Sequence, residues 1–423
     1  MKKTILLPIL TVAALLLTSI SFLGGPETIA HQWFDVYFPI QSKCFRPAGQ
    51  LKSRGYYKPV LLKDGRILIA SDNLSLSPFI ARTSMPEIYD PKTQTTVRHS
   101  DLLGEDFTKK YRFISEHPAI TLKDGRVLFV GDASIGLSPK AKQGEQGYTT
   151  QKQFPTAYLV DPETGKGKFY YDQKLAHSAG QLIMKPNGNV LVFSGLAIPY
   201  TKNAGGVFEF NPKDETFTTV GHIKDAPKGL PDKPFWLKGE QITFKDELKG
   251  RPDTPFWLDK EQIILIGTLD SRHHLVEIYN TRTNTSEILA RLSWVFRPHF
   301  IASLPDGTLL EHVIDTPTKF RVFDPKTKQF TDIPGPSHTY LYSVQLSDGN
   351  VLLIADEKIA IFDAKRKTIK IIDHFNRKLF GESLIVTPAD KVYLLGGSYG
   401  DHEGHIQDVL MFDYKNYLQE HAE

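Results

Sequence analysis

Short apolar stretches alternate with tight polar turns along the chain from about residue 56 to the C-terminus. One kind of turn places Asp-Gly or Asn-Gly between two apolar runs, as in Leu-Lys-Asp-Gly-Arg-Val-Leu at residues 122–128. Asp, Asn and Gly tolerate the positive φ of a tight hairpin, so the pattern predicts two antiparallel strands joined by a turn. Clear copies lie at residues 62–68, 122–128, 185–191, 304–310 and 346–352, and weaker copies at residues 258–263 and 387–392.

A second kind of turn follows each copy of the first. It has an apolar or aromatic run, then Asp or Asn, often with Pro next, as in Ile-Tyr-Asp-Pro at residues 88–91. Asp at the first position and Pro at the second favour a type I turn between two strands. The copies lie at residues 88–91, 159–162, 208–212, 278–281, 322–325, 361–364 and 411–414.

The strict alternation of the two turns predicts seven units, each a four-stranded antiparallel sheet. Such a unit cannot bury both of its faces alone, so the units must stack against one another. A propeller blade takes roughly 40–50 residues, and longer spacings indicate inserted loops. The sequence therefore predicts an all-β fold, a seven-bladed propeller.

Residues 122–131 and 157–165 resemble the bacterial kelch consensus, which also occurs in the galactose oxidase group. The double glycine of that consensus is present here at Gly396 and Gly397. The resemblance covers the chain from about residue 55 to the C-terminus and implies a kelch-like propeller related to the galactose oxidase central domain. We expect a single propeller domain over residues 31–423. It implies no particular function, because kelch propellers serve many purposes.

The closure of the ring needs one more strand, because the chain ends soon after the last turn. Residues 34–38 alternate like a strand and belong to no repeat, so we expect them to complete the last blade and cover its edge. The alternative is an N-terminal arm that lies on the surface.

The N-terminus has Lys2 and Lys3 before an apolar run at residues 4–23, as in an export signal. The run also approaches the roughly 20 residues that span a bilayer. Residues 1–30 are therefore expected to be a signal peptide or a membrane anchor helix. The body of the protein is expected to be periplasmic, extracellular or membrane-anchored facing outside.

Charge and cysteine content argue against several classes of function and of site. The formal net charge is +3, from 51 basic and 48 acidic residues, which gives no long-range field for nucleic acid. Cys44 is the only cysteine, so the chain can form neither an internal disulfide nor a thiolate metal cage. The copper site of galactose oxidase needs a cysteine cross-linked to a tyrosine, and Cys44 precedes the first repeat. We expect no cofactor, no metal and a monomeric protein.

Candidate ligand-binding residues lie where the innermost strand of each blade begins, about seven to ten residues before its first turn. They are Arg54, Tyr57, His117, His177, Arg297, His299, His338 and Glu382. Such a His-lined funnel could bind an anion, a sugar or a metal. The alternative is that these histidines are structural and bond to nearby backbone.

A duplicated motif marks an insertion at residues 223–258. Residues 228–237 recur as residues 249–258, and each copy contains Phe-Trp-Leu. Exposed Trp236 and Trp257 could contact a partner or stack on sugar rings, whereas the alternative is that they pack between blades.

No complete catalytic constellation is present, so the leading interpretation is a non-catalytic binding module for a protein or glycan outside the cytoplasm. The alternative is a carbohydrate-active or other small-ligand enzyme that uses the His-lined funnel.

Overall fold

The computed structural model describes most of the repeat region and leaves out residues 1–39 and several connections. The described residues are 40–52, 56–72, 87–98, 118–130, 157–170, 175, 177–178, 181–193, 196–197, 206–222, 256–270, 273–293, 297–314, 319–335, 342–355, 357–380, 383–396, 398–399, 404–405 and 407–421. The predicted signal or anchor at residues 1–30 lies outside them. None of the helices formed by the described residues is both long and apolar enough to cross a bilayer.

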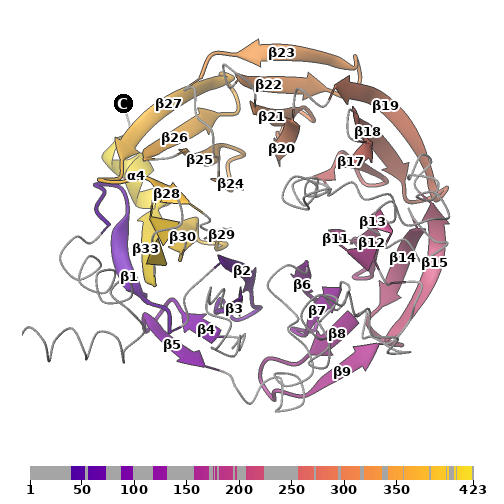
Figure 1. Ribbon diagram of the computed structural model, residues 1–423, viewed down its shortest axis with the longest axis horizontal. Coiled ribbons are helices and arrows are strands. Elements are labelled where there is room, and N and C mark those ends of the chain that lie inside the picture. The colour runs from indigo at the N-terminus through magenta and orange to yellow at the C-terminus, as the bar shows by residue number, and fades with distance from the viewer. Residues whose placement is uncertain are drawn as a thin grey trace, which may run out of the picture.

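Seven four-stranded antiparallel sheets are arranged around a central axis, as Figure 1 shows, so the fold is the predicted all-β, seven-bladed propeller. The strands of each blade are given from the innermost outward. Blade 1 has β2 (Tyr56–Leu61), β3 (Ile67–Asp72), β4 (Glu87–Asp90) and β5 (Thr95–Arg98), and blade 2 has β6 (Ala119–Thr121), β7 (Val127–Val130), β8 (Ala157–Val160) and β9 (Gly167–Tyr170). Blade 3 has β11 (Gln181–Met184), β12 (Val190–Phe193), β14 (Gly206–Asn211) and β15 (Thr216–His222). Blade 4 has β16 (Phe256–Trp257), β17 (Gln262–Asp270), β18 (His273–Asn280) and β19 (Thr285–Ser293). Blade 5 has β20 (Arg297–Ser303), β21 (Leu309–Ile314), β22 (Lys319–Asp324) and β23 (Gln329–Ile333). Blade 6 has β24 (Tyr342–Gln345), β25 (Val351–Ala355), β26 (Lys358–Asp363) and β27 (Thr368–His374). Blade 7 has β29 (Ser383–Val386), β30 (Lys391–Leu395), β33 (Asp408–Asp413) and β1 (Arg46–Gln50).

The hydrophobic core lies between blades. Val60 and Leu68 of blade 1, for example, pack with Val127 and Phe129 of blade 2 in one buried cluster. Each sheet is therefore covered on its faces by its neighbours, as radial stacking requires. Burying these side chains stabilises the ring by about 1.5–3 kcal/mol for each large apolar residue.

The first turn of each blade forms as its residue types predict. In Asp-Gly-Arg at residues 64–66, Asp64 accepts a hydrogen bond from the Arg66 N–H at 3.0 Å and Gly65 has φ of 89°. The two weak copies also form turns: Leu258 N–H donates to the Gln262 carbonyl at 2.9 Å, and Thr387 N–H to the Lys391 carbonyl at 3.0 Å. In the last blade Asp390 takes the positive φ, at 58°.

The ring is closed by an N-terminal strand, at a position different from the predicted one. β1 pairs antiparallel with β33 and supplies the outermost strand of blade 7. The residues at this position are Arg46–Gln50, and residues 34–38 lie outside the described part of the chain. The N-terminal region therefore supplies the closing strand, but the strand is formed by Arg46–Gln50, which follows the expected residues 34–38 in the sequence.

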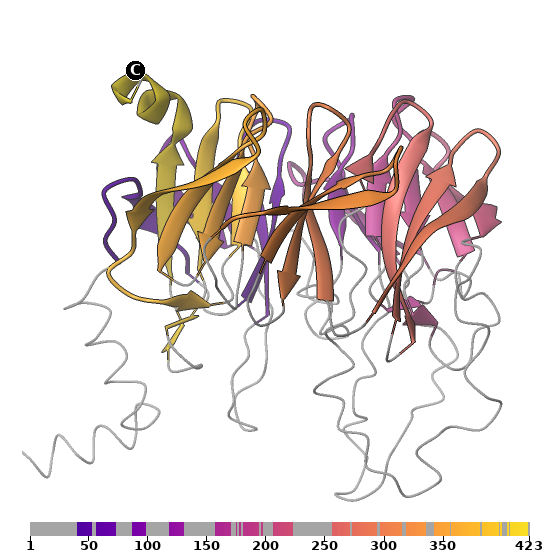
Figure 2. The same cartoon turned by 90° about the horizontal axis from the view of Figure 1, so that it is seen from above.

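The disc has two distinct faces. Every innermost strand runs toward the Asp-Gly or equivalent turn, and the Asp-Pro turns lie at the same end, which we call the turn face. The short helix α4 (Tyr414–Glu420) also lies there, as seen edge-on in Figure 2. We call the opposite end, where the innermost strands begin, the far face.

Candidate functional site

Four of the predicted ligand-binding residues belong to strands at the far face. Tyr57 lies near the start of β2, Arg297 and His299 lie in the first half of β20, and His177 lies in the short strand β10 (His177–Ser178). In β20, His299 pairs with His312 of β21. Topology therefore brings these four positions to the same face of the disc. Arg54, His117, His338 and Glu382 lie outside the described residues.

The inner hairpins of blades 3 and 7 extend beyond the far face. In blade 3, β10 pairs with β13 (Leu196–Ala197) in the same register as β11 with β12. In blade 7, β28 (Leu379–Phe380) pairs with β31 (Ser398–Tyr399) in the register of β29 with β30. A third strand, β32 (Gly404–His405), pairs with β31.

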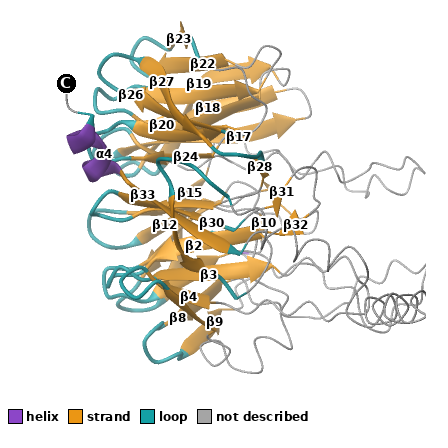
Figure 3. Cartoon of the chain, turned by 90° about the vertical axis from the view of Figure 1, so that its left-hand side faces the viewer, coloured by secondary structure: helices purple, strands orange, loops and turns teal. Residues whose placement is uncertain are grey.

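These extensions stand away from α4, on the other side of the disc, as Figure 3 shows. Blades 1 and 2 separate them on one side of the ring, and blades 4 to 6 separate them on the other. Gly396, with φ of 62°, directly follows β30. The extensions of blades 3 and 7, which we call the two walls, therefore stand at two separate sectors of the far face.

Blade 5 contains a buried ion pair beside the strand that holds His299. Arg321 of β22 donates from Nε and Nη2 to Glu311 of β21, at 2.8 and 3.0 Å. The Glu311 side chain is fully buried, and its neighbour His312 is 2% exposed and packs on Phe320 with ring centroids 5.1 Å apart. This group was not predicted, although Glu311 and His312 interrupt an apolar strand, a pattern that indicates buried polar residues.

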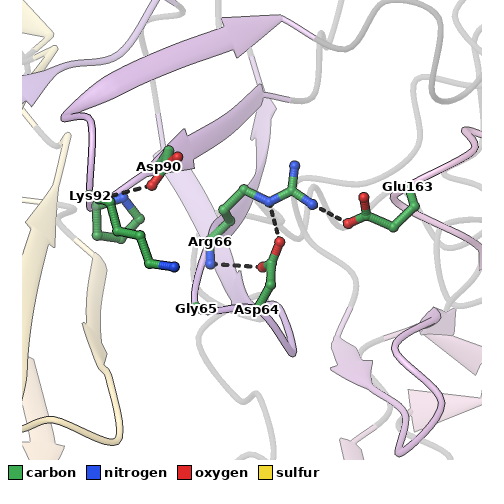
Figure 4. A pocket seen from close by; sticks show the side chains of 7 residues that line it. Asp64, Gly65, Arg66, Asp90, Lys92 and Glu163 are labelled. Atoms are coloured by element: carbon green, nitrogen blue, oxygen red, sulfur yellow. Dashed lines mark hydrogen bonds and ion pairs between the residues drawn. The ribbon is translucent and has the colours of Figure 1, made fainter.

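The turn face carries a polar cleft of about 380 Å³ between blades 1 and 2, shown in Figure 4. Arg66 pairs there with Asp64 of its own turn and with Glu163 of the next blade. Burial would raise the pKa of Asp64, but hydrogen bonds and charge from Arg66 outweigh it and lower that pKa. The cation at the centre of this cleft is therefore already paired with two carboxylates. The lining residues are Asp64, Gly65, Arg66, Asp90, Pro91, Lys92 and Glu163.

The same kind of contact recurs around the turn face. Arg126 in the first turn of blade 2 pairs with Glu215 of blade 3 at 2.5 Å, and Lys168 also pairs with Glu215 at 2.8 Å. The hydrogen bond from Lys168 is the largest cause that lowers the pKa of Glu215, and Arg126 adds to it. Between blades 5 and 6, Lys367 pairs with Asp306 at 2.8 Å. These charges hold neighbouring blades together.

Trp257 lies between blades, which is the alternative to its predicted role at a partner surface. Its indole N–H donates to the Met184 carbonyl of blade 3 at 3.2 Å, and its carbonyl accepts from the Ser303 hydroxyl of blade 5 at 3.5 Å. The ring packs against a buried cluster that includes Ile263 and Tyr279. Trp236 and most of the insertion at 223–258 lie outside the described residues.

Within the part of the chain that the structure describes, no three His, Cys, Asp or Glu side chains gather as a metal site.

No family model and no curated protein matches the sequence.

Many solved structures are similar in fold, among them the following two. One is a catalytically inactive variant of virginiamycin B lyase from Staphylococcus aureus with quinupristin. Its TM-score is 0.51 at 10% identity, over 88% of this chain and 99% of that one. The other is the extracellular domain of a putative hybrid two-component system from B. thetaiotaomicron. Its TM-score is 0.49 at 10% identity, and the match covers 85% of this chain but only 40% of that one. At 10% identity the likeness to the lyase structure shows the fold alone.

Proposed function

We propose that this protein is an exported, kelch-like β-propeller that binds a protein or glycan ligand outside the cytoplasm, on its far face. The observation that carries the proposal is the pair of register-continuous hairpin extensions in blades 3 and 7. Binding residues are commonly held on loops and strand ends by a rigid scaffold, and a closed ring of seven packed blades is such a scaffold.

The positions of polar residues support the same face. Tyr57, Arg297 and His299 belong to innermost strands near their far-face ends, and His177 belongs to one of the two walls. A concave site with a few convergent polar groups is the usual form of a ligand site. At the turn face, by contrast, Arg66, Arg126 and Lys367 contribute their charge to contacts between blades.

The test is binding to arrays of immobilised glycans and immobilised peptides, with matched variants at the two faces. We expect Tyr57→Ala and His299→Ala to weaken binding roughly tenfold or more, because a buried hot-spot side chain contributes about 2 kcal/mol. Lys92→Ala and Lys326→Ala, on exposed turns of the turn face, serve as controls and should leave binding unchanged. Loss of binding in the turn-face variants alone would refute the proposal.

The insertion at 223–258 has its own informative variant. Because the Trp257 indole already joins blades 3 and 4, Trp257→Ala would confound binding with stability. Trp236→Ala should weaken capture without lowering the melting temperature if the insertion contacts the partner. The enzyme alternative uses the same far face, and release of a modified product from an array spot would favour it over simple binding.

A further inference from the structure

The rim of the disc has one sector with a distinct surface, formed by the outer strands of blades 6, 7 and 1. Going around the rim, β27, β1 and β5 follow one another, with α4 beside them, as Figure 1 shows. Ser42 and Cys44, just before β1, donate to Asp373 of β27, and Thr96 of β5 donates to the Gln50 carbonyl of β1. The three strands therefore form one continuous surface, which we call the seam rim.

Exposed charge on β27, on β1 and on the segment before β1 is of one sign, whereas α4 beside them carries one exposed Lys415 and one exposed Glu420. Across residues 41–50 and 363–374, every exposed charged side chain is Lys or Arg, apart from the exposed His374. The two carboxylates of these segments, Asp363 and Asp373, are partly buried and accept backbone N–H bonds. The exposed basic residues are Lys43, Arg46, Lys365, Arg366 and Lys370.

Exposed apolar side chains gather on the same sector. Among the described residues, the exposed large apolar side chains are Val97 on β5, Ile371 on β27 and Leu418 on α4, with exposed fractions of 54%, 42% and 43%. Single exposed apolar residues are ordinary, but here two of the three lie on the outer strands of blades 6 and 1, and the third lies on α4, which directly follows β33 of blade 7.

Blade 3 provides an internal comparison. Its outer strand β15 has the same sequence of buried and exposed positions as β27 and a β-bulge at the same place. The two positions that hold Lys370 and Ile371 in β27 hold Thr218 and Thr219 in β15. The basic and apolar character is therefore a property of the seam rim and not of the fold.

The N-terminal segment reaches the disc at this sector. Ile40, the first described residue, is buried with Phe375 and Leu379 at the junction of blades 6 and 7. Residues 24–39 could extend over about 55 Å at most, so an anchor at residues 4–23 would hold the seam rim near a bilayer. Such a tether raises the effective concentration of the rim at the lipid surface.

We propose that the seam rim rests on an anionic lipid surface, so that the propeller stands edge-on to the membrane with the far face accessible. Each Lys or Arg near an anionic surface contributes about 1 kcal/mol, and partly inserted apolar side chains add to the affinity. The proposal depends on the predicted tether and not on the identity of the far-face ligand.

The test places a fluorescent label on the rim of the full chain, reconstituted in vesicles of phosphatidylglycerol and phosphatidylcholine. Burial, with Asp373 nearby, raises the pKa of the Cys44 thiol to about 12, so a thiol probe reacts with an introduced exposed cysteine instead. The label is attached at Ile371→Cys or, as the matched control, at Thr219→Cys. We expect nitroxide-labelled lipid to quench the label at residue 371 much more strongly than at residue 219. The difference should disappear in phosphatidylcholine alone.

Charge variants test the electrostatic contribution. Lys365→Gln and Lys370→Gln should each reduce the equilibrium constant for contact between rim and lipid, obtained from the ratio of quenched to unquenched label, about fivefold. Lys326→Gln, at the equivalent turn of blade 5, should not. Equal quenching at residues 371 and 219, or shielding of residue 371 from a water-soluble quencher without vesicles, would overturn the proposal. Array binding needs no vesicles, so failure of either proposal leaves the other measurable.

Discussion

The hydroxyl of Tyr89 donates a hydrogen bond to the carbonyl of Ala48, and so joins the first blade to the strand that completes the seventh. The Tyr89 ring is fully buried and meets Tyr393 of blade 7 edge-on, with centroids 5.7 Å apart. On the other side of the closing strand, Leu51 N–H donates to the Gln407 carbonyl at 2.7 Å. The closing strand, which belongs to blade 7, is therefore also hydrogen-bonded to blade 1.

Replacing Tyr89 by Phe should lower the free energy of unfolding by about 1–3 kcal/mol, because the variant leaves the buried Ala48 carbonyl without its donor. The measurement is urea unfolding followed by near-ultraviolet circular dichroism. Tyr417→Phe, on the exposed helix α4, is the control and should change the midpoint little. An unchanged midpoint for Tyr89→Phe would mean that this bond does not stabilise the closure.

Gly49 fits the closing strand because it has no side chain. Its φ is +119°, and a Cβ atom there would lie 2.5 Å from the Gln94 carbonyl oxygen of blade 1. Gly49→Ala should therefore destabilise the protein by more than the roughly 1 kcal/mol of an unfavourable φ alone. Gly65 has φ of +89° and open space around its Cβ position, so Gly65→Ala measures that backbone cost separately. Equal thermal shifts for the two variants would contradict the steric argument.

The blades were predictable because turn chemistry is local. Asp, Asn, Gly and Pro determine each turn through their own φ and hydrogen bonds, and even the weak copy at residues 387–392 folds as a turn with Asp390 at positive φ. The closing strand was not predictable in the same way. Its residues, Arg-Pro-Ala-Gly-Gln, show no alternation and include Pro47, which is tolerated only because β1 is an edge strand. Pairing with β33 in the folded protein determines where this strand forms.

The candidate site was predictable as a set of positions but not as a set of contacts. Counting back from the turns correctly assigns Tyr57, Arg297 and His299 to innermost strands. The Glu311–Arg321 pair depends on which residues face each other across β21 and β22, which no single strand reveals. Trp257 was ambiguous for the same reason, because the acceptor of its indole N–H belongs to another blade.

Removing one partner of the buried pair in blade 5 should be strongly destabilising. Glu311→Gln leaves the Arg321 charge, whose side chain is 18% exposed, without its counter-ion, and a loss of about 3–5 kcal/mol is expected. The double variant Glu311→Leu with Arg321→Met should recover much of that loss, because it removes both desolvated charges. A double-mutant cycle by chemical denaturation measures the coupling. Additive losses would show that the pair acts as two independent side chains.

Asp373 makes the attachment of the N-terminal segment sensitive to acid. It accepts hydrogen bonds from the Ser42 hydroxyl at 2.5 Å and from the Cys44 N–H at 2.8 Å. Burial would raise the pKa of Asp373, but these bonds, with others from backbone N–H groups, lower it below its ordinary value. A carboxyl whose folded pKa is lowered stabilises the fold above its unfolded pKa, about 3.9, and loses that contribution as the pH falls through the folded value.

Asp373→Asn should therefore be less stable than the parent at pH 7 and should lose less stability than the parent on going to pH 3. Other carboxyls with lowered pKa values, such as Asp306 and Glu215, contribute to the acid loss in both proteins, so the difference between the two proteins isolates Asp373. Urea midpoints across this pH range provide the measurement. Glu420→Gln, at an exposed position on α4, is the control and should follow the parent. If the parent and Asp373→Asn lost equal stability in acid, the attachment of residues 41–45 would not depend on the Asp373 charge.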